Sequence, residues 1–403
     1  MSEILKECYG RNILKTTIKQ ESPFYFYDLD KLERHLKTMS EILHPDIKLW
    51  YACKANPMSA ILKVFRNLGF GIDVASQGEL DQALRSGIKP SEILSTGPAK
   101  SKDYLESLID HEVEVVVAES IGQLNDLEEV AKNFNVRPNV LLRVQLDWHE
   151  GESVLGGDQI TPFGIGINDW NKCNFSIYKN INIIGLHAFQ WGNLLELDHL
   201  KDIWNQTTKK LVNFAKDNQI NLEVLDLGGG IGIPYQNEKN ALSFRDIHNV
   251  LLEIKETYNL KKIWMELGRY AVGECGFYLA KVIDRKIVRG KNLLVLNGGI
   301  NHLARPALTK QYFPCSTLEK ENNQSQSFQI HGPLCTALDY LGTYELPINT
   351  QAGDWLVFSQ AGAYGFTEAM PFFLCHDLPS ESIYYRGDYM APRPPKTSAD
   401  WMI

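Results

Sequence analysis

The fold is decided by the stretch Ile47–Pro57, which reads IKLWYACKANP. Its first seven residues form a mostly apolar run typical of a buried strand, and Lys54 stands where that strand ends. In a barrel of parallel strands, catalytic groups gather at this carboxyl-terminal rim. A desolvated lysine loses its proton readily, and a neutral amine can form a Schiff base. The alternative is a structural lysine at a solvated strand end. The other segments of the sequence have to distinguish between these two roles of Lys54.

Outward from this stretch, short apolar runs alternate with segments of helical periodicity from about residue 45 to 270. The predicted strands are Ile47–Cys53, Phe70–Ala75, Ile93–Thr96, Val113–Ala118, Val140–Leu146, Ile181–Ala188, Leu222–Leu227 and Lys262–Glu266. The predicted helices include Ser76–Ser86, Ser101–His111, Ser120–Asn133, Leu197–Asn218 and Phe244–Tyr258. This α/β pattern of eight strand–helix units fits a (β/α)8 TIM barrel, with an open doubly wound sheet as the alternative.

After residue 270 the pattern changes to strands separated by turns. The predicted strands there are Gly276–Val288, Asn292–Leu296, Phe328–His331 and Trp355–Ser359. Residues 24–27, FYFY, are a further predicted strand that joins the same sheet. We therefore expect a (β/α)8 barrel at residues 28–270. A β-rich domain, sandwich- or barrel-like, is expected to be made of 1–27 and 271–403.

The composition limits the classes of function. The chain has 403 residues, 44% of them hydrophobic, and 41 basic against 49 acidic residues give a net charge of −8. That balance argues against nucleic-acid and anionic-membrane partners. There is no transmembrane-length apolar run, and the first residues, MSEILKE, lack a signal-peptide core. The seven scattered cysteines show no C-x-x-C pair, which indicates reduced thiols in a cytoplasmic enzyme and no metal site.

Three segments at the ends of predicted barrel strands carry candidate chemistry. Residues 226–232, DLGGGIG, offer glycine amides that can turn toward one phosphate, although an unliganded turn is an equal alternative. Residues 265–269, MELGR, combine a carboxylate suited to a protonated ring nitrogen with an arginine suited to a phosphate. An ion pair at the rim is the plain alternative. His187 can stack on a flat cofactor or transfer protons, or be structural.

Two segments of the β-rich domain add a thiol and a phenol. Residues 332–339, GPLCTALD, place Cys335 after a Gly-Pro turn, where a thiol is exposed to react, or else packs as a small buried residue. Residues 361–365, AGAYG, place the hydroxyl of Tyr364 between glycines, as a candidate phosphate or substrate contact.

Taken together, six of these segments resemble the fold-type III pyridoxal-phosphate decarboxylases, the diaminopimelate/ornithine decarboxylase family. They are YACKAN (51–56), IDVAS (72–76), GGG (228–230), ELGR (266–269), GPLC (332–335) and GAYG (362–365). Their order and spacing are those of the family, and the resemblance covers nearly the whole chain. It implies pyridoxal 5'-phosphate as cofactor, an amino acid as substrate, and a head-to-tail homodimer with two shared active sites.

The resemblance also assigns roles to residues of this chain. Lys54 is similar to the Schiff-base lysine, with Asp73 and Arg143 as its supporting pair. His187 would stack on the cofactor ring, and Glu266 would pair with the pyridine nitrogen. The residues that would hold the phosphate are Gly228, Gly229, Gly230, Arg269 and Tyr364.

The same resemblance makes Cys335 the proton donor, acting in the active site of the neighbouring subunit. Decarboxylation leaves a carbanion, for which the cofactor is an electron sink. The carbanion must then be protonated at carbon, which requires a positioned acid. Lys54, His187 and Cys335 are therefore the candidate catalytic residues.

The residue after Cys335 departs from the best-known members. In diaminopimelate decarboxylases a glutamate follows the cysteine and in ornithine decarboxylases an aspartate does, whereas this chain has the neutral Thr336. Gln190 replaces the family's serine three residues after the stacking histidine. With the ending GAYGFT (362–367), the chain is similar to decarboxylases of carboxylate siderophore pathways, whose substrates carry a citryl group on the distal amine. We therefore expect N-citrylornithine, in rhizoferrin-type biosynthesis, as the substrate.

A citryl group carries carboxylates, so its pocket should contain cations. The candidates are Arg305, His302, Arg386 and Arg393, of which the last two also suit a solvated tail. Arg305 matches a substrate-binding arginine of the diaminopimelate enzymes. Thr336 and Asp339 are assigned to the same substrate pocket, and residues 148–159 are a candidate lid.

Three other interpretations stay open. A diaminopimelate-type decarboxylase of lysine biosynthesis would have a variant pocket, because Thr336 is not acidic. An amino-acid racemase on the same barrel would need a base on the second face and no Gly-Pro-x-Cys segment. A non-catalytic homologue is opposed by the intact Lys54, Glu266 and Cys335.

Overall fold

The computed structural model describes residues 5, 7–8, 14–19, 21–147, 152–153, 156–157, 160–235, 240–320, 324–400 and 402. The chain divides into two compact units. The barrel unit contains His35–Ile233 and Asn240–Ala271, and the β-rich unit contains Met1–Arg34, Pro234–Lys239 and Val272–Ile403. Each unit is described in its own frame.

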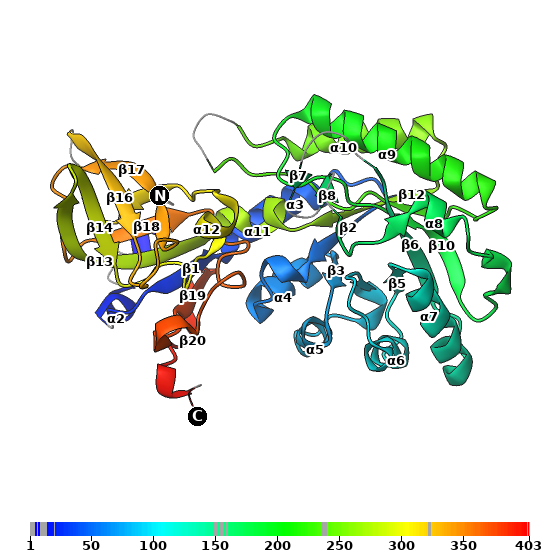
Figure 1. Ribbon diagram of the computed structural model, residues 1–403, viewed down its shortest axis with the longest axis horizontal. Helices are drawn as coiled ribbons and strands as arrows, with labels where there is room; N and C mark the ends of the chain where they lie inside the picture. The colour runs from blue at the N-terminus through cyan, green and yellow to red at the C-terminus, as the bar shows by residue number, and fades with distance from the viewer. Residues whose placement is uncertain are drawn as a thin grey trace. The chain divides into compact units, whose positions relative to one another are not determined.

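Parallel strands form a closed barrel in the first unit (Figure 1). The strands are β2 (Ile47–Ala52), β3 (Gly71–Val74), β4 (Ile93–Ser95), β5 (Val115–Ala118), β6 (Asn139–Gln145), β10 (Asn182–His187), β11 (Val224–Asp226) and β12 (Lys262–Leu267). They pair in the order β10-β11-β12-β2-β3-β4-β5-β6, and β10 pairs back with β6. All the predicted barrel strands and the (β/α)8 fold are confirmed, and the open sheet is excluded.

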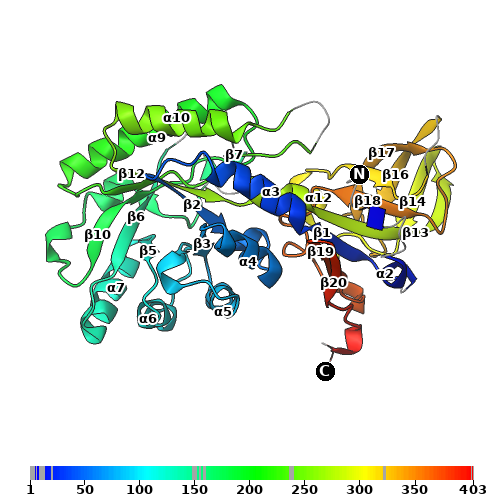
Figure 2. The same ribbon diagram turned by 180° about the vertical axis from the view of Figure 1, so that it is seen from behind.

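Helices follow most strands and cover the outside of the barrel. They are α3 (Leu29–Ser40), α4 (Ser59–Asn67), α5 (Gln77–Arg85), α6 (Lys102–Asp110), α7 (Ile121–Phe134), α8 (Ile167–Trp170), α9 (Leu197–Asp217), α10 (Phe244–Thr257) and α11 (Arg269–Val272). Figures 1 and 2 show α5, α6 and α7 on one side of the barrel and α9 and α10 on the opposite side. Three helices start at serine caps, Ser76, Ser101 and Ser120, whose side chains accept an amide hydrogen three residues on.

The barrel interior is a packed core. Trp50 of β2 and Trp264 of β12 meet edge to face, with ring centroids 5.0 Å apart. Lys48 Nζ lies 3.8 Å from the Trp50 ring centroid, where a cation is attracted by the face of the ring. Leu94 and Val117 belong to the same buried cluster. Because side chains fill the interior, reactive groups have room only at the rim.

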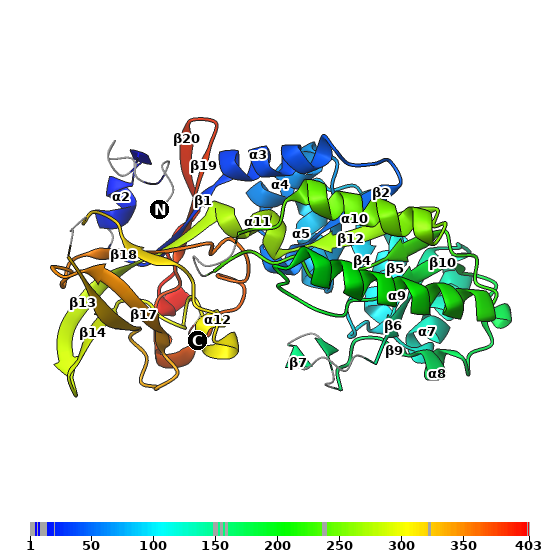
Figure 3. The ribbon, with the colours of Figure 1, turned by 90° about the horizontal axis from the view of Figure 1, so that it is seen from above.

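The second unit is built on a mixed nine-stranded sheet. Its elements are α2 (Lys15–Lys19), β1 (Phe24–Asp28), β13 (Gly276–Val288), β14 (Lys291–Leu296), α12 (Arg305–Thr309), β15 (Cys315–Thr317), β16 (Ser325–His331), β17 (Tyr340–Pro347), β18 (Trp355–Ser359), β19 (Ser380–Tyr385) and β20 (Asp388–Arg393). The main path runs β17-β16-β14-β13-β1-β19-β20, and β18 pairs with β13 and β15. Figure 3 shows β19 and β20 as a hairpin.

The predicted N-terminal strand joins this sheet. β1 is antiparallel to β13 and parallel to β19, so the chain's early residues complete a sheet made mostly from its last third. Its four aromatic residues, 24–27, are all buried. Phe24 packs edge to face on Trp355 at a centroid distance of 5.7 Å. This packing against residues that are distant in the sequence explains why so aromatic a segment precedes the barrel.

Three two-residue strands lie beyond the end of β6. β7 (Glu152–Ser153) pairs with β8 (Gly156–Gly157), and β9 (Ile165–Gly166) pairs with β6. Apart from β7 and β8, the candidate lid at 148–159 lies outside the described residues. In the part of the chain that the structure describes, no helix has the length and apolar character needed to cross a membrane.

Candidate active site

Lys54 lies in a short 3-10 turn, Cys53–Ala55, directly after β2. Its side chain is 43% exposed, and Nζ is 3.7 Å from Oδ2 of the buried Asp73 at the neighbouring strand β3. Thr96 donates its hydroxyl to Asp73 Oδ1 over 2.7 Å. Burial and the negative charge of Glu266 raise the pKa of Asp73, and Lys54 and Thr96 oppose that rise. The Lys54 side chain is thus accessible to solvent rather than desolvated. Its amine faces the Asp73 carboxyl group, which the Thr96 hydroxyl holds in place.

Arg143 has a carboxylate partner that was not predicted. Its Nη1 lies 2.9 Å from Oε1 of Glu119, and both side chains are buried. Glu119 directly follows β5, and its Oε2 accepts the amide hydrogen of Gly164 over 3.1 Å. The Arg143 guanidinium also lies over the ring of Phe163, 4.8 Å from its centroid. These contacts fix the guanidinium on the barrel rim.

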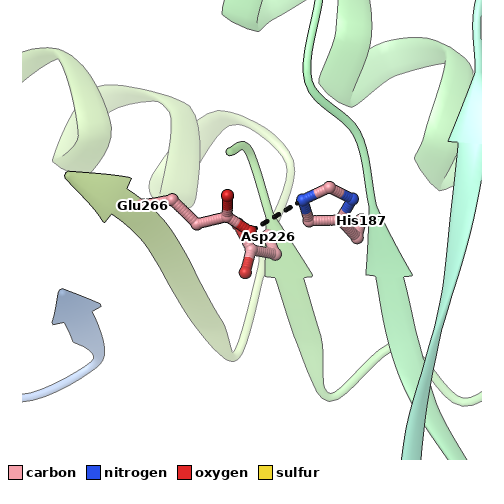
Figure 4. A group of neighbouring side chains, drawn as sticks. All are labelled: His187, Asp226 and Glu266. Atoms are coloured by element: carbon pink, nitrogen blue, oxygen red, sulfur yellow. Dashed lines mark hydrogen bonds and ion pairs between the residues drawn. The ribbon is translucent and has the colours of Figure 1, made fainter. Parts of the chain in front are cut away.

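His187, Asp226 and Glu266 end three neighbouring strands and reach toward one another (Figure 4). His187 Nε2 lies 2.9 Å from Glu266 Oε1. One ligand atom from each of the three residues lies within 4.8 Å of the others. All three side chains are buried. The cluster is close enough for a single small group to touch every member.

The three groups of this cluster differ in charge. Burial alone would raise the pKa of Glu266, but the charge and hydrogen bond of His187, with Lys54 and Arg143, lower it to about 2. Burial and the Glu266 charge raise the pKa of Asp226 well above its ordinary value. The cluster therefore presents an ionised Glu266 beside a carboxyl group that resists ionisation.

The glycine turn that follows β11 packs tightly against neighbouring backbone. A Cβ on Gly229 would lie 2.3 Å from the carbonyl oxygen of Glu266, and one on Gly230 would lie 2.7 Å from that of Trp191. Gly228 and Gly230 have positive φ angles of 62° and 108°. Among the described residues, the amides of Gly229 and Gly230 donate no hydrogen bond. Such a turn with free amides is suited to an anion.

These features fit pyridoxal phosphate. Lys54 supplies an accessible amine, and Glu266 supplies an ionised carboxylate for a protonated ring nitrogen. The glycine turn supplies amides for the phosphate. Two buried atoms near the expected ring, His187 Nδ1 and Asp226 Oδ2, have no hydrogen-bond partner in the described part of the chain. Unpaired polar atoms in such a place indicate room for a ligand.

In the β-rich unit, Cys335 is an exposed free thiol and Thr336 is half-buried. Thr336 Oγ1 accepts the amide hydrogen of Leu338 over 3.2 Å. Asp339 is 1% exposed, and its two oxygens accept the amide hydrogens of Ile300 and Leu334 over 2.8 and 2.7 Å. Both oxygens are therefore used to shape the loop that carries Cys335. The assignment of Asp339 to the substrate pocket stays a prediction.

His302 is also structural. It is 2% exposed, and its ring nitrogens contact the Tyr278 hydroxyl at 3.0 Å and the Asp377 carbonyl oxygen at 2.8 Å. Burial lowers its pKa to about 4. A neutral buried imidazole supplies no positive charge, which opposes the predicted role of His302 as a cation for the substrate.

The arginines expected to bind a citryl group all have acidic partners. Arg305 Nη1 lies 2.7 Å from Glu368 Oε2, and the Arg305 guanidinium lies 5.0 Å from the centroid of the Tyr364 ring. Arg393 pairs with Glu381 at 2.7 Å, and Arg386 pairs with Glu33 at 3.1 Å. These pairs reduce the positive charge available to a carboxylate-rich ligand.

Three polar groups on the barrel rim were not predicted as functional residues. Glu119 and Asp226 each stand at the end of a predicted strand, a position that could have identified them. Lys100 is buried on the loop after β4 and donates to the carbonyl oxygen of Gly97. Burial lowers its pKa to about 8. Neither pattern nor spacing in the sequence distinguishes Lys100 from a surface lysine.

Comparison with known proteins gives the family. Residues 29–273 match the family model described as pyridoxal-dependent decarboxylase, pyridoxal binding domain. The L-glutamyl-(BtrI acyl-carrier protein) decarboxylase of Niallia circulans is 28% identical over 96% of this chain and 94% of its own. The diaminopimelate decarboxylase of Neisseria meningitidis serogroup A is 31% identical over 86% of each chain.

A solved structure shows the same fold. The crystal structure of diaminopimelate decarboxylase from Helicobacter pylori complexed with L-lysine superposes with a TM-score of 0.87. The match covers 96% of this chain and 98% of that one, at 23% sequence identity. The two-unit architecture described above is therefore shared with a solved enzyme.

Proposed function

The chain belongs to the pyridoxal-dependent decarboxylases, and from this premise we propose how its own residues remove the α-carboxyl group of an amino acid. The enzyme class and the cofactor follow from the family. The observation that carries the residue assignment is the position of Lys54, next to the strand end and 3.7 Å from Asp73. The ionised Glu266 supports the same assignment from the other end of the site.

Each residue has a defined task in this proposal. Bound pyridoxal phosphate supplies an electron sink for the bonding electrons left behind by carbon dioxide. Lys54 would hold the cofactor through its amine, with Asp73 keeping that amine oriented. Glu266 would keep a proton on the ring nitrogen, because a carboxylate stabilises the cationic form of a neighbouring base. The amides of Gly229 and Gly230 would bind the phosphate.

The final proton transfer is assigned to Cys335. The carbon that loses carbon dioxide must be reprotonated, and an exposed thiol on a loop held by Asp339 can serve as the acid. We propose that it acts in a homodimer with shared active sites. The loop of Cys335 also carries Leu338, whose side chain is 61% exposed, and Leu308 of the same unit is 64% exposed. Burying such side chains at a subunit contact would stabilise a dimer.

Two substrates compete within this function. The diaminopimelate decarboxylases among the relatives support a diaminopimelate-type substrate, and Arg305 resembles the substrate-binding arginine of those enzymes. The neutral Thr336 supports instead an amino acid whose distal amine is acylated, such as N-citrylornithine in siderophore biosynthesis. The Niallia circulans relative acts on an acylated carrier by its name. Because the diaminopimelate decarboxylases are similar to this chain over most of its length, we rank the diaminopimelate-type substrate first.

A substrate panel tests this proposal. The cofactor-loaded protein is given meso-diaminopimelate, lysine, ornithine, N-citrylornithine and a glutamyl group on an acyl-carrier protein, and carbon dioxide release is compared at equal concentration. The expected result is fastest release from meso-diaminopimelate. Preference for N-citrylornithine would transfer the function to amino acids with an acylated distal amine, and preference for the glutamyl carrier would transfer it to carrier-bound amino acids. Racemisation without carbon dioxide release would contradict the decarboxylase itself.

The cellular setting remains a prediction. All seven cysteines are free thiols, which is consistent with the expected cytoplasmic location.

A further inference from the structure

Asp226 is a buried carboxyl group to which the proposed reaction gives no task. It ends β11, the strand that pairs with both β10 and β12, and its side chain lies close to those of His187 and Glu266 (Figure 4). It is fully buried at 0% exposure. Its Oδ1 accepts the amide hydrogen of Gly228 over 2.8 Å. Its Oδ2 has no hydrogen-bond partner among the described residues.

The surroundings of Asp226 cannot support two negative charges. The charged and titratable groups that act on Asp226 are Glu266 on β12 and Arg143 on β6, with His187 on β10 in the same cluster. The Arg143 guanidinium is already paired with Glu119 at 2.9 Å. Two carboxylates this close in a buried site do not both ionise, because each charge raises the energy of the other.

The hydrogen bonds decide which carboxyl group keeps the proton. Glu266 Oε1 is 2.9 Å from His187 Nε2, and a carboxylate there accepts the hydrogen of that nitrogen. Lys54 and Arg143 further favour the ionised form of Glu266. No group in the described part of the chain donates to the buried Asp226 Oδ2, so a negative charge on it would be unsolvated. A hydroxyl at Oδ2 avoids that cost and gives the cluster a donor.

We propose that Asp226 is a positioning residue that remains protonated beside Glu266 and holds the pair at a single negative charge. This inference rests on the proposed function, in which Glu266 faces the ring nitrogen of the cofactor. A single negative charge on the Asp226–Glu266 pair matches the single positive charge of a protonated ring nitrogen. Two negative charges would favour the binding of a second proton in the site. Through Oδ1, the same residue also fixes Gly228, the first glycine of the turn assigned to the phosphate. Asp226 therefore acts both on Glu266, which is assigned to the ring nitrogen, and on the glycine turn, which is assigned to the phosphate.

The protonation state can be measured directly by infrared spectroscopy of the full-length protein. A buried protonated carboxyl group gives a carbonyl band separate from that of carboxylates. We expect this band at pH 7.5 with and without cofactor, and we expect it to shift when aspartate is labelled with carbon-13. Asp226→Asn should remove it. The control is Asp169→Asn, at an exposed carboxylate that pairs with Lys172, which should leave it unchanged.

Cofactor binding provides the second readout. An asparagine copies the neutral acid, since its oxygen can accept from Gly228 and its amide can donate toward Glu266. Asp226→Asn should therefore keep the cofactor dissociation constant and the pH dependence of its visible absorbance within about threefold of wild type. Asp226→Ala, which removes both contacts, should weaken binding about tenfold or more.

Two results would overturn the inference. The first is the absence of a labelled carboxylic-acid band in the wild-type protein, which remains measurable even if the variants do not fold. The second is a loss of cofactor affinity in Asp226→Asn as large as in Asp226→Ala, because that would require a charged Asp226. Failure of the proposed function would look different: the band would be present while no amino acid lost carbon dioxide.

Discussion

The barrel rim and the loops around Asp339 and His302 in the β-rich unit use their buried polar groups in opposite ways. On the barrel rim, His187 Nδ1 and Asp226 Oδ2 are buried without partners among the described residues. In the β-rich unit, the buried Asp339 and His302 have their polar atoms engaged by the unit's own backbone and side chains. At the rim these unpaired atoms are open to a ligand, whereas the polar atoms of Asp339 and His302 are used to hold loops of the β-rich unit.

The largest effect should come from the barrel, at Lys54. Lys54→Ala should lower carbon dioxide release at least about 10⁴-fold, because removing a covalent catalytic group commonly has that size of effect. The visible absorbance of the cofactor-loaded protein should be lost as well. The matched control is Lys172→Ala, at a 73% exposed lysine paired with Asp169, and it should change neither. A Lys54→Ala protein that decarboxylates normally would contradict the assignment of Lys54 as the residue that holds the cofactor.

The next effect concerns stability and belongs to the β-rich unit. Asp339→Ala leaves the amides of Ile300 and Leu334 without an acceptor, which should lower the free energy of unfolding by about 3 kcal/mol. Asp339→Asn retains one acceptor oxygen and should lose less. Denaturant unfolding measures both. Unchanged stability combined with a raised KM would instead indicate that Asp339 binds the substrate. It would contradict the view that Asp339 serves to hold its loop.

Cys335 is the exception in the β-rich unit, because it is exposed and has a proposed chemical role. Cys335→Ala should lower kcat about 100-fold, the usual contribution of a positioned acid, and leave the cofactor dissociation constant unchanged. Cys375→Ala, at another exposed thiol of the same unit, is the control and should have wild-type kcat. If Cys335 has no chemical role, the variant's rate per folded protein molecule will equal that of wild type.

A pH effect tests whether His302 is buried and neutral. Its pKa is lowered to about 4 in the folded chain, against about 6.5 when unfolded, so the unfolded chain binds more protons between these values. The stability is thus intact above about pH 6.5 and falls as the pH drops toward 4. Wild type should lose about 1.4 kcal/mol more than His302→Gln between pH 7.5 and 5.5. Equal losses in the two proteins would mean that His302 is charged or exposed.

The smallest effect should be at a surface ion pair. Arg386→Ala removes the 3.1 Å contact with Glu33, in which the arginine side chain is 65% exposed. Pairs of this kind contribute at most about 1 kcal/mol, so the unfolding free energy should change by less than that. KM for the preferred substrate should not change. A rise in KM of tenfold or more would identify Arg386 as a substrate contact, as the citryl hypothesis expects.

The barrel could be predicted from sequence because its repeat makes local patterns decisive. Every apolar run between helical segments became a strand, and Lys54, His187 and Glu266 fell at or beside strand ends. Serines at 76, 101 and 120 mark where helices begin. A parallel barrel then brings strand ends to one rim, so spacing in the sequence becomes proximity in space.

The β-rich unit was less predictable because its partners are distant in sequence. β17, β19 and β20 were not predicted, and β19 begins with the polar residues Ser380, Glu381 and Ser382. Glu381 pairs with Arg393 and accepts the hydroxyl hydrogen of Tyr27, and Ser382 accepts that of Tyr389. No local pattern reveals contacts that span most of the chain. For the same reason, the pairing of Arg305 with Glu368 could not be inferred.

The most direct test of the central claim is the release of labelled carbon dioxide from an amino acid labelled at its α-carboxyl group. The cofactor-loaded protein is incubated with labelled meso-diaminopimelate, and the Lys54→Ala protein serves as the blank. We expect release of labelled carbon dioxide by wild type and none above background by the variant. Equal release from both proteins, or loss of optical activity without any labelled gas, would contradict it.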